Sequence, residues 1–307
     1  MKQELEYIFI GGAGRSGTTL VQKIMLAQQG VVGGAEFYHT KDIMDLYEKI
    51  ASNTKNQVLK NAIPMADLKR QFRELLHSFF ESYLKDDSRF ISEKTPTNIE
   101  VVDPIFELLP TAYFLNVYRD GRAVLNSHFQ VKKRARKQGK NLTEINLIRT
   151  SMYWRSCIRK GLEAKGKYPQ RVFSLQYEEL IRNPAQAFGE TFDHLGIRAN
   201  DSLNRPEEIQ FEDKKQEAHV NEVWYTEKMY NQGLAEDRID QWKKELSFFH
   251  RFGANVIMYP ELKELDYSVP SYYRIFHLTF DYLFHWKSNL KKWLILRPII
   301  QLKRRLQ

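Results

Sequence analysis

The chain has 307 residues, with 47 Lys or Arg against 38 Asp or Glu, so its formal net charge is +9. Hydrophobic residues make up 42% and aromatic residues 13%, which is enough for a sizeable buried core and excludes global disorder. Cys157 is the only cysteine, which excludes a disulfide scaffold and a zinc site built on several thiolates. The basic excess predicts anionic partners.

Strands and helices are predicted to alternate along most of the chain. Apolar runs predict buried strands at 7–11, 90–92, 112–118 and 172–176. Helical spacing of apolar residues predicts helices at 18–29, 42–51, 66–84 and from 177 to 195. This order predicts an α/β fold, a central, mostly parallel sheet with helices on both faces. We expect this domain to span residues 1–266 and a basic, aromatic helical extension to span residues 267–307.

Signals for targeting and membranes are weak. The N-terminus lacks the basic start and apolar middle of a signal peptide. No run reaches the roughly 20 apolar residues that a spanning helix needs. With a single cysteine as well, we expect a cytoplasmic protein. Residues 271–305 interleave aromatic side chains with Lys and Arg, which is typical of a helix on acidic lipid. Packing on the domain or on the partner subunit of a homodimer explains this composition as well.

A glycine-rich loop carries the strongest chemical signal. Residues 12–19 read GAGRSGTT and lie between the first predicted strand and the first predicted helix. Glycines let the backbone approach an anion, and the helix N-terminus directs N–H groups toward it. Thr18 stands where the nucleoside-triphosphatase loop has its lysine. The loop therefore favours a metal-free ligand over a triphosphate with Mg²⁺. The alternative is that the loop is an ordinary glycine turn that binds no ligand.

A second motif follows the strand predicted at 112–118. Residues 118–127 read YRDGRAVLNS. The two motifs together resemble the sulfotransferases that use 3′-phosphoadenosine 5′-phosphosulfate (PAPS), and most closely the tyrosylprotein and bacterial carbohydrate types. In that family the loop binds the 5′-phosphosulfate, and an Arg and a Ser eight positions later bind the 3′-phosphate. Arg119 and Ser127 have this spacing of eight. A charge-assisted contact between Arg and phosphate distinguishes PAPS from nucleotides without a 3′-phosphate.

The resemblance implies a P-loop-like sulfotransferase fold and a set of residues that bind PAPS. These residues are Gly14, Arg15, Ser16, Gly17, Thr18, Thr19, Arg119, Ser127 and Tyr177. Arg238 and Trp242 resemble the family's closing segment, but the local identity is too thin to assign them roles.

The reaction that the resemblance implies needs a base and a cation. Glu36, which lies 21 residues after Arg15, corresponds to the general base, and His39 is the alternative base. Lys94, which lies 25 residues before Arg119, corresponds to a lysine that stabilises the leaving group. Glu36, Lys94 and Arg15 form the predicted catalytic set. The structural alternatives are a glutamate at a helix N-terminus and a surface lysine paired with Glu93.

We therefore expect a PAPS-dependent sulfotransferase that needs no metal and binds no nucleic acid. Its acceptor is expected to carry a hydroxyl, on either a peptide tyrosine or a sugar. The alternative is a P-loop kinase or another nucleotide-binding protein, which Thr18 disfavours. The basic run at 132–140 is either a solvated helix end or a surface that steers anions toward the site.

Overall fold

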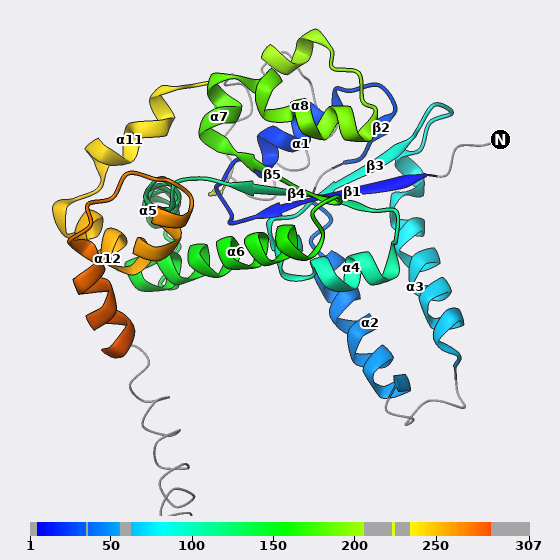
Figure 1. Ribbon diagram of the computed structural model, residues 1–307, viewed down its shortest axis with the longest axis horizontal. Coiled ribbons are helices and arrows are strands. Elements are labelled where there is room, and N and C mark those ends of the chain that lie inside the picture. Colours follow the sequence, from blue (N-terminus) through cyan, green and yellow to red (C-terminus); the bar gives the residue numbers. More distant parts are fainter. Residues whose placement is uncertain (1–4, 35, 56–62, 206–222, 225–233, 284–307) are drawn as a thin grey trace, which may run out of the picture.

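The computed structural model describes residues 5–34, 36–55, 63–205, 223–224 and 234–283. One parallel sheet lies at its centre, with strands in the order β2-β3-β1-β4-β5 (Figure 1). The strands are β1 (Glu6–Gly12), β2 (Val31–Val32), β3 (Phe90–Lys94), β4 (Tyr113–Tyr118) and β5 (Val172–Gln176). The predicted α/β fold with a parallel sheet is confirmed.

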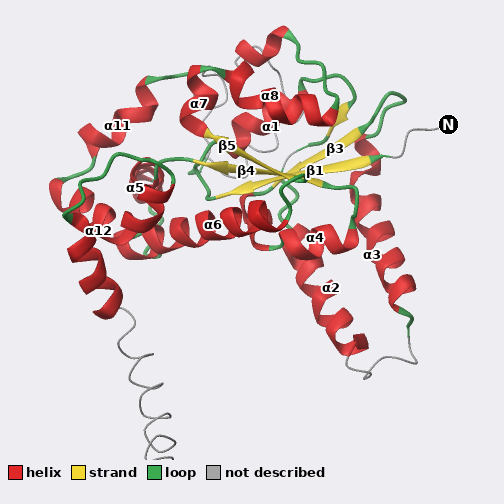
Figure 2. Cartoon of the chain, viewed as in Figure 1, coloured by secondary structure: helices red, strands yellow, loops and turns green. Residues whose placement is uncertain are grey.

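Helices cover both faces of the sheet, as Figure 2 shows. One face carries α1 (Thr18–Leu26), α7 (Tyr177–Arg182) and α8 (Pro184–Leu195). The opposite side carries α2 (Thr40–Lys55), α3 (Met65–Phe80), α4 (Val102–Leu108), α5 (Gly121–Lys137), α6 (Leu147–Lys167) and α12 (Phe248–Glu264). Further elements of the described residues are the short helices η1 (Glu81–Tyr83), η2 (Pro96–Glu100) and η3 (Asp201–Asn204), and α11 (Asp237–Glu245).

Strand β1 contributes to two hydrophobic clusters because successive side chains of a strand point to opposite faces. Tyr7 and Phe9 belong to the cluster with α2, α3, α4 and α6. Ile8 and Ile10 belong to the cluster with α1 and α8. A run that is apolar at every position is what a strand covered on both faces requires. This packing fixes the central strand that precedes the glycine loop.

The parallel register brings three motifs to one edge of the sheet. Ile10 of β1 pairs with Lys94 of β3 on one side and with Leu115 of β4 on the other. The glycine loop that follows β1, Lys94 at the end of β3 and Arg119 after β4 therefore share the carboxyl edge. Ligands of open parallel sheets bind at this edge.

Several predicted boundaries differ from the observed ones. The helix predicted from 177 to 195 is two helices, because Pro184 begins α8 and the Asn183 side chain caps it. The helix predicted at 66–84 ends at Phe80, and the η1 turn follows. Sequence analysis missed the short strand β2 and the helices α4, α6, α11 and α12.

The predicted extension at 267–307 is described only to residue 283, and it is helical over 273–283. Its beginning packs on the domain, because Tyr273 is buried and Tyr267 donates a hydrogen bond to Glu178 at 2.9 Å. Residues 284–307 lie outside the described residues. In the described part of the chain, no helix is long and apolar enough to cross a membrane.

Candidate active site

A cavity of about 920 Å³ opens at the carboxyl edge of the sheet. Its walls combine the glycine loop, the start of α5 and segments from α6, α7 and α11. Nearly all of the predicted site residues line it: Gly14, Arg15, Gly17, Thr18, Thr19, Glu36, Arg119, Ser127 and Tyr177. The two others, Ser16 and Lys94, are buried. Sequence positions up to 163 residues apart, from Gly14 to Tyr177, thus form one site.

The glycine loop has a backbone that only certain residues tolerate. Gly17 has a φ of 103° and Arg15 a φ of 75°, both in the left-handed region. A Cβ on Gly17 would lie 2.5 Å from the Tyr177 ring, so a side chain there would displace the ring. No side chain caps the N-terminus of α1, and its first N–H groups therefore keep their capacity to bind an anion.

The two predicted phosphate motifs are in direct contact. Arg15 Nε donates a hydrogen bond to Ser127 Oγ at 3.0 Å, and Arg15 Nη1 donates to the Trp224 carbonyl at 3.0 Å. Arg119 lies over the Tyr177 ring, with its guanidinium carbon 4.1 Å from the ring centroid. The Trp154 indole donates to the Arg119 carbonyl at 2.9 Å and holds its backbone.

Two buried polar atoms in these motifs have no hydrogen-bond partner within the described part of the chain. They are Ser16 Oγ in the glycine loop and Arg119 Nε after β4. Leaving a buried polar atom unpaired costs about 1–3 kcal/mol. Both atoms belong to residues that sequence analysis assigned to a phosphate ligand, so the site has unmet donor capacity where that ligand is expected.

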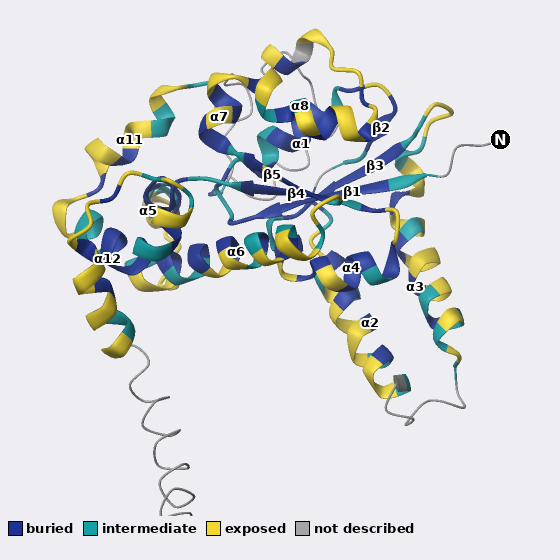
Figure 3. Ribbon diagram, viewed as in Figure 1, coloured by how far each residue is buried: buried dark blue, intermediate teal, exposed yellow. Residues whose placement is uncertain are grey.

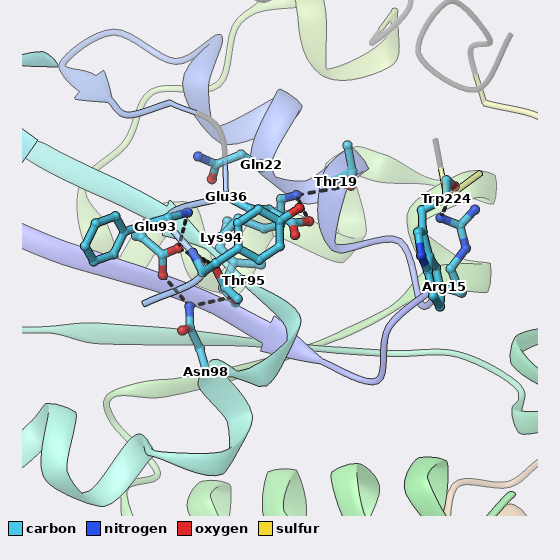
Figure 4. A network of polar contacts seen from close by, with 12 residues as sticks. Arg15, Thr19, Gln22, Glu36, Glu93, Lys94, Thr95, Asn98 and Trp224 are labelled. Carbon is cyan, nitrogen blue, oxygen red and sulfur yellow. Dashed lines mark hydrogen bonds and ion pairs between the residues drawn. The ribbon is translucent and has the colours of Figure 1, made fainter. Parts of the chain in front are cut away.

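Glu36 and Lys94 form a buried ion pair (Figure 4). Glu36 is 8% exposed and Lys94 is 2% exposed. Lys94 Nζ also donates to Thr19 Oγ1 at 3.4 Å, which joins the pair to the glycine loop. The alternative of a surface lysine paired with Glu93 is therefore wrong, and Glu36 is not a helix N-terminal residue, because α2 begins only at Thr40.

Glu93 fastens the segment that carries Glu36 to the end of β3. Its carboxylate accepts hydrogen bonds from the Thr95 hydroxyl at 2.6 Å, the Asn98 amide at 2.5 Å and the Thr40 hydroxyl at 3.2 Å. It also accepts one from the Phe37 N–H at 3.4 Å. Burial raises the pKa of Glu93, while these hydrogen bonds lower it. Sequence analysis missed this role.

His39, the alternative base, lies elsewhere. Its imidazole is exposed and forms a 2.9 Å hydrogen bond with Asp42, and it is not part of the cavity lining. Glu36 does line the cavity. The structure thus brings together Glu36 and the glycine loop, and leaves His39 at the surface.

Four further cavity residues were missed or left unassigned. Tyr153 accepts a hydrogen bond from Gly14 N–H at 2.9 Å, and Arg238 accepts one from Arg119 through its carbonyl at 2.7 Å. Trp242 packs under the Arg122 guanidinium at 4.3 Å. His128 lines the cavity beside Ser127, and burial lowers its pKa to about 4. The sequence signals available were the adjacency of His128 to Ser127 and the resemblance of Arg238 and Trp242 to the family's closing segment.

The basic run at 132–140 divides between cavity and surface. Arg134 lines the cavity, and its Nε donates to the Val223 carbonyl at 3.0 Å. Lys133 and residues 136–140 are exposed.

The described residues around the cavity carry more cations than carboxylates. The six cations are Arg15, Lys23, Arg119, Arg134, Arg149 and Arg238, and the four carboxylates are Glu36, Glu144, Asp237 and Glu245. The lining therefore suits an anionic ligand. Among the described residues, no cluster of three or more His, Cys, Asp or Glu side chains could hold a metal ion.

Comparison with known proteins settles the family. The model of the sulfotransferase family matches residues 7–201 of this chain. The chain belongs to the sulfotransferase family. The match includes the glycine loop, Glu36, Lys94, the motif that begins at Arg119, and Tyr177, so the family membership predicted from the sequence is confirmed.

Curated relatives include protein-tyrosine sulfotransferases of several animals. Protein-tyrosine sulfotransferase 2 of Gallus gallus is 23% identical over 222 residues, covering 67% of this chain and 55% of its own length. The Drosophila melanogaster protein-tyrosine sulfotransferase is 24% identical, covering 67% of this chain and 41% of its own length. The chain thus spans about half the length of the curated relatives it matches.

Solved structures support the fold. The sulfotransferase domain from the curacin biosynthetic pathway aligns with a TM-score of 0.61 and 14% identity, over 88% of this chain and all of that domain. The sulfotransferase domain of the Synechococcus PCC 7002 olefin synthase aligns with a TM-score of 0.55 and 18% identity, over 88% of this chain and 98% of that domain. At this identity the likeness shows a shared sulfotransferase fold.

Proposed function

We propose that the chain transfers the sulfuryl group of PAPS to an acceptor hydroxyl and releases adenosine 3′,5′-bisphosphate. One observation carries the proposal. The hydrogen bond from Arg15 to Ser127 joins the two phosphate motifs in one cavity, and the buried Glu36–Lys94 pair lies at the same glycine loop. A glycine turn with ordinary caps would not need the second motif beside it.

The residues present fit PAPS. The glycine loop and the uncapped start of α1 would hold the 5′-phosphosulfate, with Ser16, Thr18 and Thr19 supplying hydroxyls. Arg119 and Ser127 would hold the 3′-phosphate, and Arg119 Nε, which has no hydrogen-bond partner among the described residues, would gain one. PAPS supplies the activated sulfuryl group itself.

The chain's own residues would supply positioning, a base and a cation. Glu36 would take the proton from the acceptor hydroxyl, because it lines the cavity and is joined to Thr19 of the glycine loop through Lys94. Lys94, held between Glu36 and Thr19, would neutralise charge that develops on the leaving phosphate. Arg15 would orient the phosphosulfate. None of these roles uses a metal ion.

The relatives favour a protein tyrosine as the acceptor, because those matched are named protein-tyrosine sulfotransferases. A sugar hydroxyl is the other acceptor in this proposal. Sulfuryl transfer to a peptide with a single tyrosine, and none to the same peptide with phenylalanine in its place, would identify the tyrosine as acceptor. The predicted cytoplasmic location and the predicted homodimer stay predictions.

Nucleotide binding tests the proposal against the kinase alternative. Thermal unfolding is measured with adenosine 3′,5′-bisphosphate, with adenosine 5′-phosphate, and with ATP plus Mg²⁺. Ligand at a hundredfold excess over Kd stabilises a protein by about 2.7 kcal/mol. We expect the bisphosphate to raise Tm by a few degrees, far more than the other two ligands. A larger shift with ATP and Mg²⁺ would support the kinase alternative instead.

A further inference from the structure

An exposed hydrophobic surface lies at the C-terminal end of the described chain. We call it the C-terminal apolar face and define it by Phe248, Phe249, Tyr272, Ile275, Phe276, Leu278, Tyr282 and Leu283. Phe249 is 81% exposed, Ile275 is 70% exposed and Tyr282 is 69% exposed. Figure 3 shows the exposed side of this region on the helix that leads away from the body beside α12. Scattered single apolar residues are normal at a surface, but a continuous group indicates a binding surface.

Ring contacts make the group continuous across two helices. Phe252 of α12 lies 5.3 Å from Phe276 and 6.3 Å from Phe248 between ring centroids. Phe248 lies 5.8 Å from Phe249. The first residues of α12 and the helix at 273–283 therefore present one surface.

Packing among the described residues leaves this surface exposed. The helix at 273–283 already packs on the domain through Tyr273, whose ring lies 5.4 Å from Phe252, and through buried His277, which hydrogen-bonds the Val256 carbonyl at 2.8 Å. Ile275, Leu278 and Tyr282 recur at intervals of three and four, so they share another side of the helix. A helix with apolar residues on both sides needs a second apolar environment.

The sequence that follows the face indicates that the partner is negatively charged. Residues 284–307 contain seven Lys or Arg and no Asp or Glu: Lys287, Lys291, Lys292, Arg297, Lys303, Arg304 and Arg305. The same residues include Trp286 and Trp293. A second copy of the chain carries the same excess of positive charge, which repels, whereas an anionic surface attracts these cations. Aromatic and basic side chains in combination suit the interface of a bilayer.

We propose that the C-terminal apolar face docks on an anionic lipid bilayer. The exposed aromatic and aliphatic side chains of the face enter the boundary between headgroups and acyl chains, and the Lys and Arg content of the sequence favours a bilayer with acidic headgroups. The enzyme then works at a membrane surface. The proposal does not depend on the reaction, because none of the residues of the face lines the cavity.

Vesicle co-sedimentation of the full chain tests the proposal. Vesicles of phosphatidylcholine alone are compared with vesicles that contain 30% phosphatidylglycerol, at low and at high salt. The variant Phe249→Ser/Ile275→Ser/Tyr282→Ser removes apolar contacts and keeps every cation. The control Leu46→Ser/Leu75→Ser changes exposed leucines of α2 and α3 instead. Thermal unfolding confirms that both variants are folded.

We expect the wild type and the control to bind the anionic vesicles, with binding weakened by high salt. The triple variant should bind at least tenfold more weakly. Wild-type binding that ignores phosphatidylglycerol, or a triple variant that binds like the wild type, would overturn the proposal. A wild-type dimer that the triple variant dissociates, together with no vesicle binding, would show that the face joins two copies and would also overturn it.

Discussion

Glu36 and Lys94 neutralise each other in a buried position at the glycine loop. Removing one partner of a buried ion pair leaves an uncompensated charge and typically costs about 3–5 kcal/mol. Truncation of either residue would therefore disturb folding and chemistry together. A substitution that keeps the shape and an acceptor oxygen for Lys94, with thermal unfolding measured beside activity, separates the two effects.

Glu36→Gln is such a substitution. A positioned base contributes roughly 10²–10⁴-fold to rate, so we expect kcat to fall within that range. Affinity for adenosine 3′,5′-bisphosphate should change less than threefold, because Arg119 and Ser127 are intact. Steady-state kinetics and calorimetry measure both quantities, with Glu74→Gln on α3 as the control. If His39→Ala loses activity while Glu36→Gln keeps it, the base is His39.

Arg119→Ala tests the residue assigned to the 3′-phosphate. A hydrogen bond to a charged group contributes about 1.5–3 kcal/mol, so affinity for adenosine 3′,5′-bisphosphate should fall roughly 10- to 100-fold. Affinity for adenosine 5′-phosphate should fall far less, since that ligand lacks the 3′-phosphate. Titration calorimetry with both ligands makes the comparison, and Arg70→Ala on α3 is the control. Equal weakening of both ligands would remove the assignment.

His128 makes the stability of the fold depend on pH. Burial lowers its pKa from 6.5 to about 4 in the folded chain. Between these values the unfolded chain binds a proton that the folded chain does not, so the free energy of unfolding falls as pH drops. A difference of this size corresponds to about 3 kcal/mol. His128→Gln should remove that dependence. Urea unfolding from pH 7 to pH 4 measures the free energy of unfolding of both proteins, and an equal decrease in both would contradict the role given to His128.

At the scale of elements, the end of β3 connects the fold to the chemistry. Lys94 reaches Glu36, and the preceding residue, Glu93, accepts hydrogen bonds from the Phe37 N–H and the Thr40 hydroxyl. The segment that carries Glu36 thus has its position set by a strand that begins 54 residues later. Glu93 and Lys94 are consecutive residues at the carboxyl end of β3. Both therefore contact the segment that carries Glu36, although successive side chains of a strand point to opposite faces.

Glu93→Gln should disturb this arrangement while leaving the cavity's nucleotide contacts in place. An amide retains one acceptor oxygen but presents donors to the hydroxyls of Thr95 and Thr40, so we expect kcat to fall at least tenfold. Affinity for adenosine 3′,5′-bisphosphate should stay within threefold. Glu93→Asp should lose less kcat than Glu93→Gln, since it keeps the carboxylate. An equal loss of kcat and nucleotide affinity would indicate general unfolding instead.

Elements with a distinct pattern were predictable from the sequence. The β1 run, the glycine loop and the Arg119 motif each combine a strand with residues suited to phosphate, and all three lie where predicted. Helix α6 was missed because charged residues recur along it and obscure its buried side, which includes Trp154 and Cys157. The partner of Lys94 was not predictable, because it depends on the register of β3 and on the path of the segment before α2.

At the scale of the whole molecule, the chain has a formal charge of +9, and two groups of its cations have different consequences. Cations around the cavity favour an anionic nucleotide, and those at 284–307 favour an anionic surface. Hydrophobic clusters on both faces of the sheet provide the core. The predicted boundary of the domain at residue 266 stays a prediction.

Transfer of labelled sulfate from PAPS tests the central claim most directly. The chain is incubated with sulfur-35 PAPS in EDTA and with three acceptors in turn, namely an acidic tyrosine peptide, its phenylalanine counterpart and an oligosaccharide. We expect label on the tyrosine peptide or on the oligosaccharide, with adenosine 3′,5′-bisphosphate released in equal amount, at a rate that EDTA does not lower. Activity that EDTA abolishes and Mg²⁺ restores, or no transfer to any acceptor by a protein that binds ATP with Mg²⁺ in preference, would contradict the account.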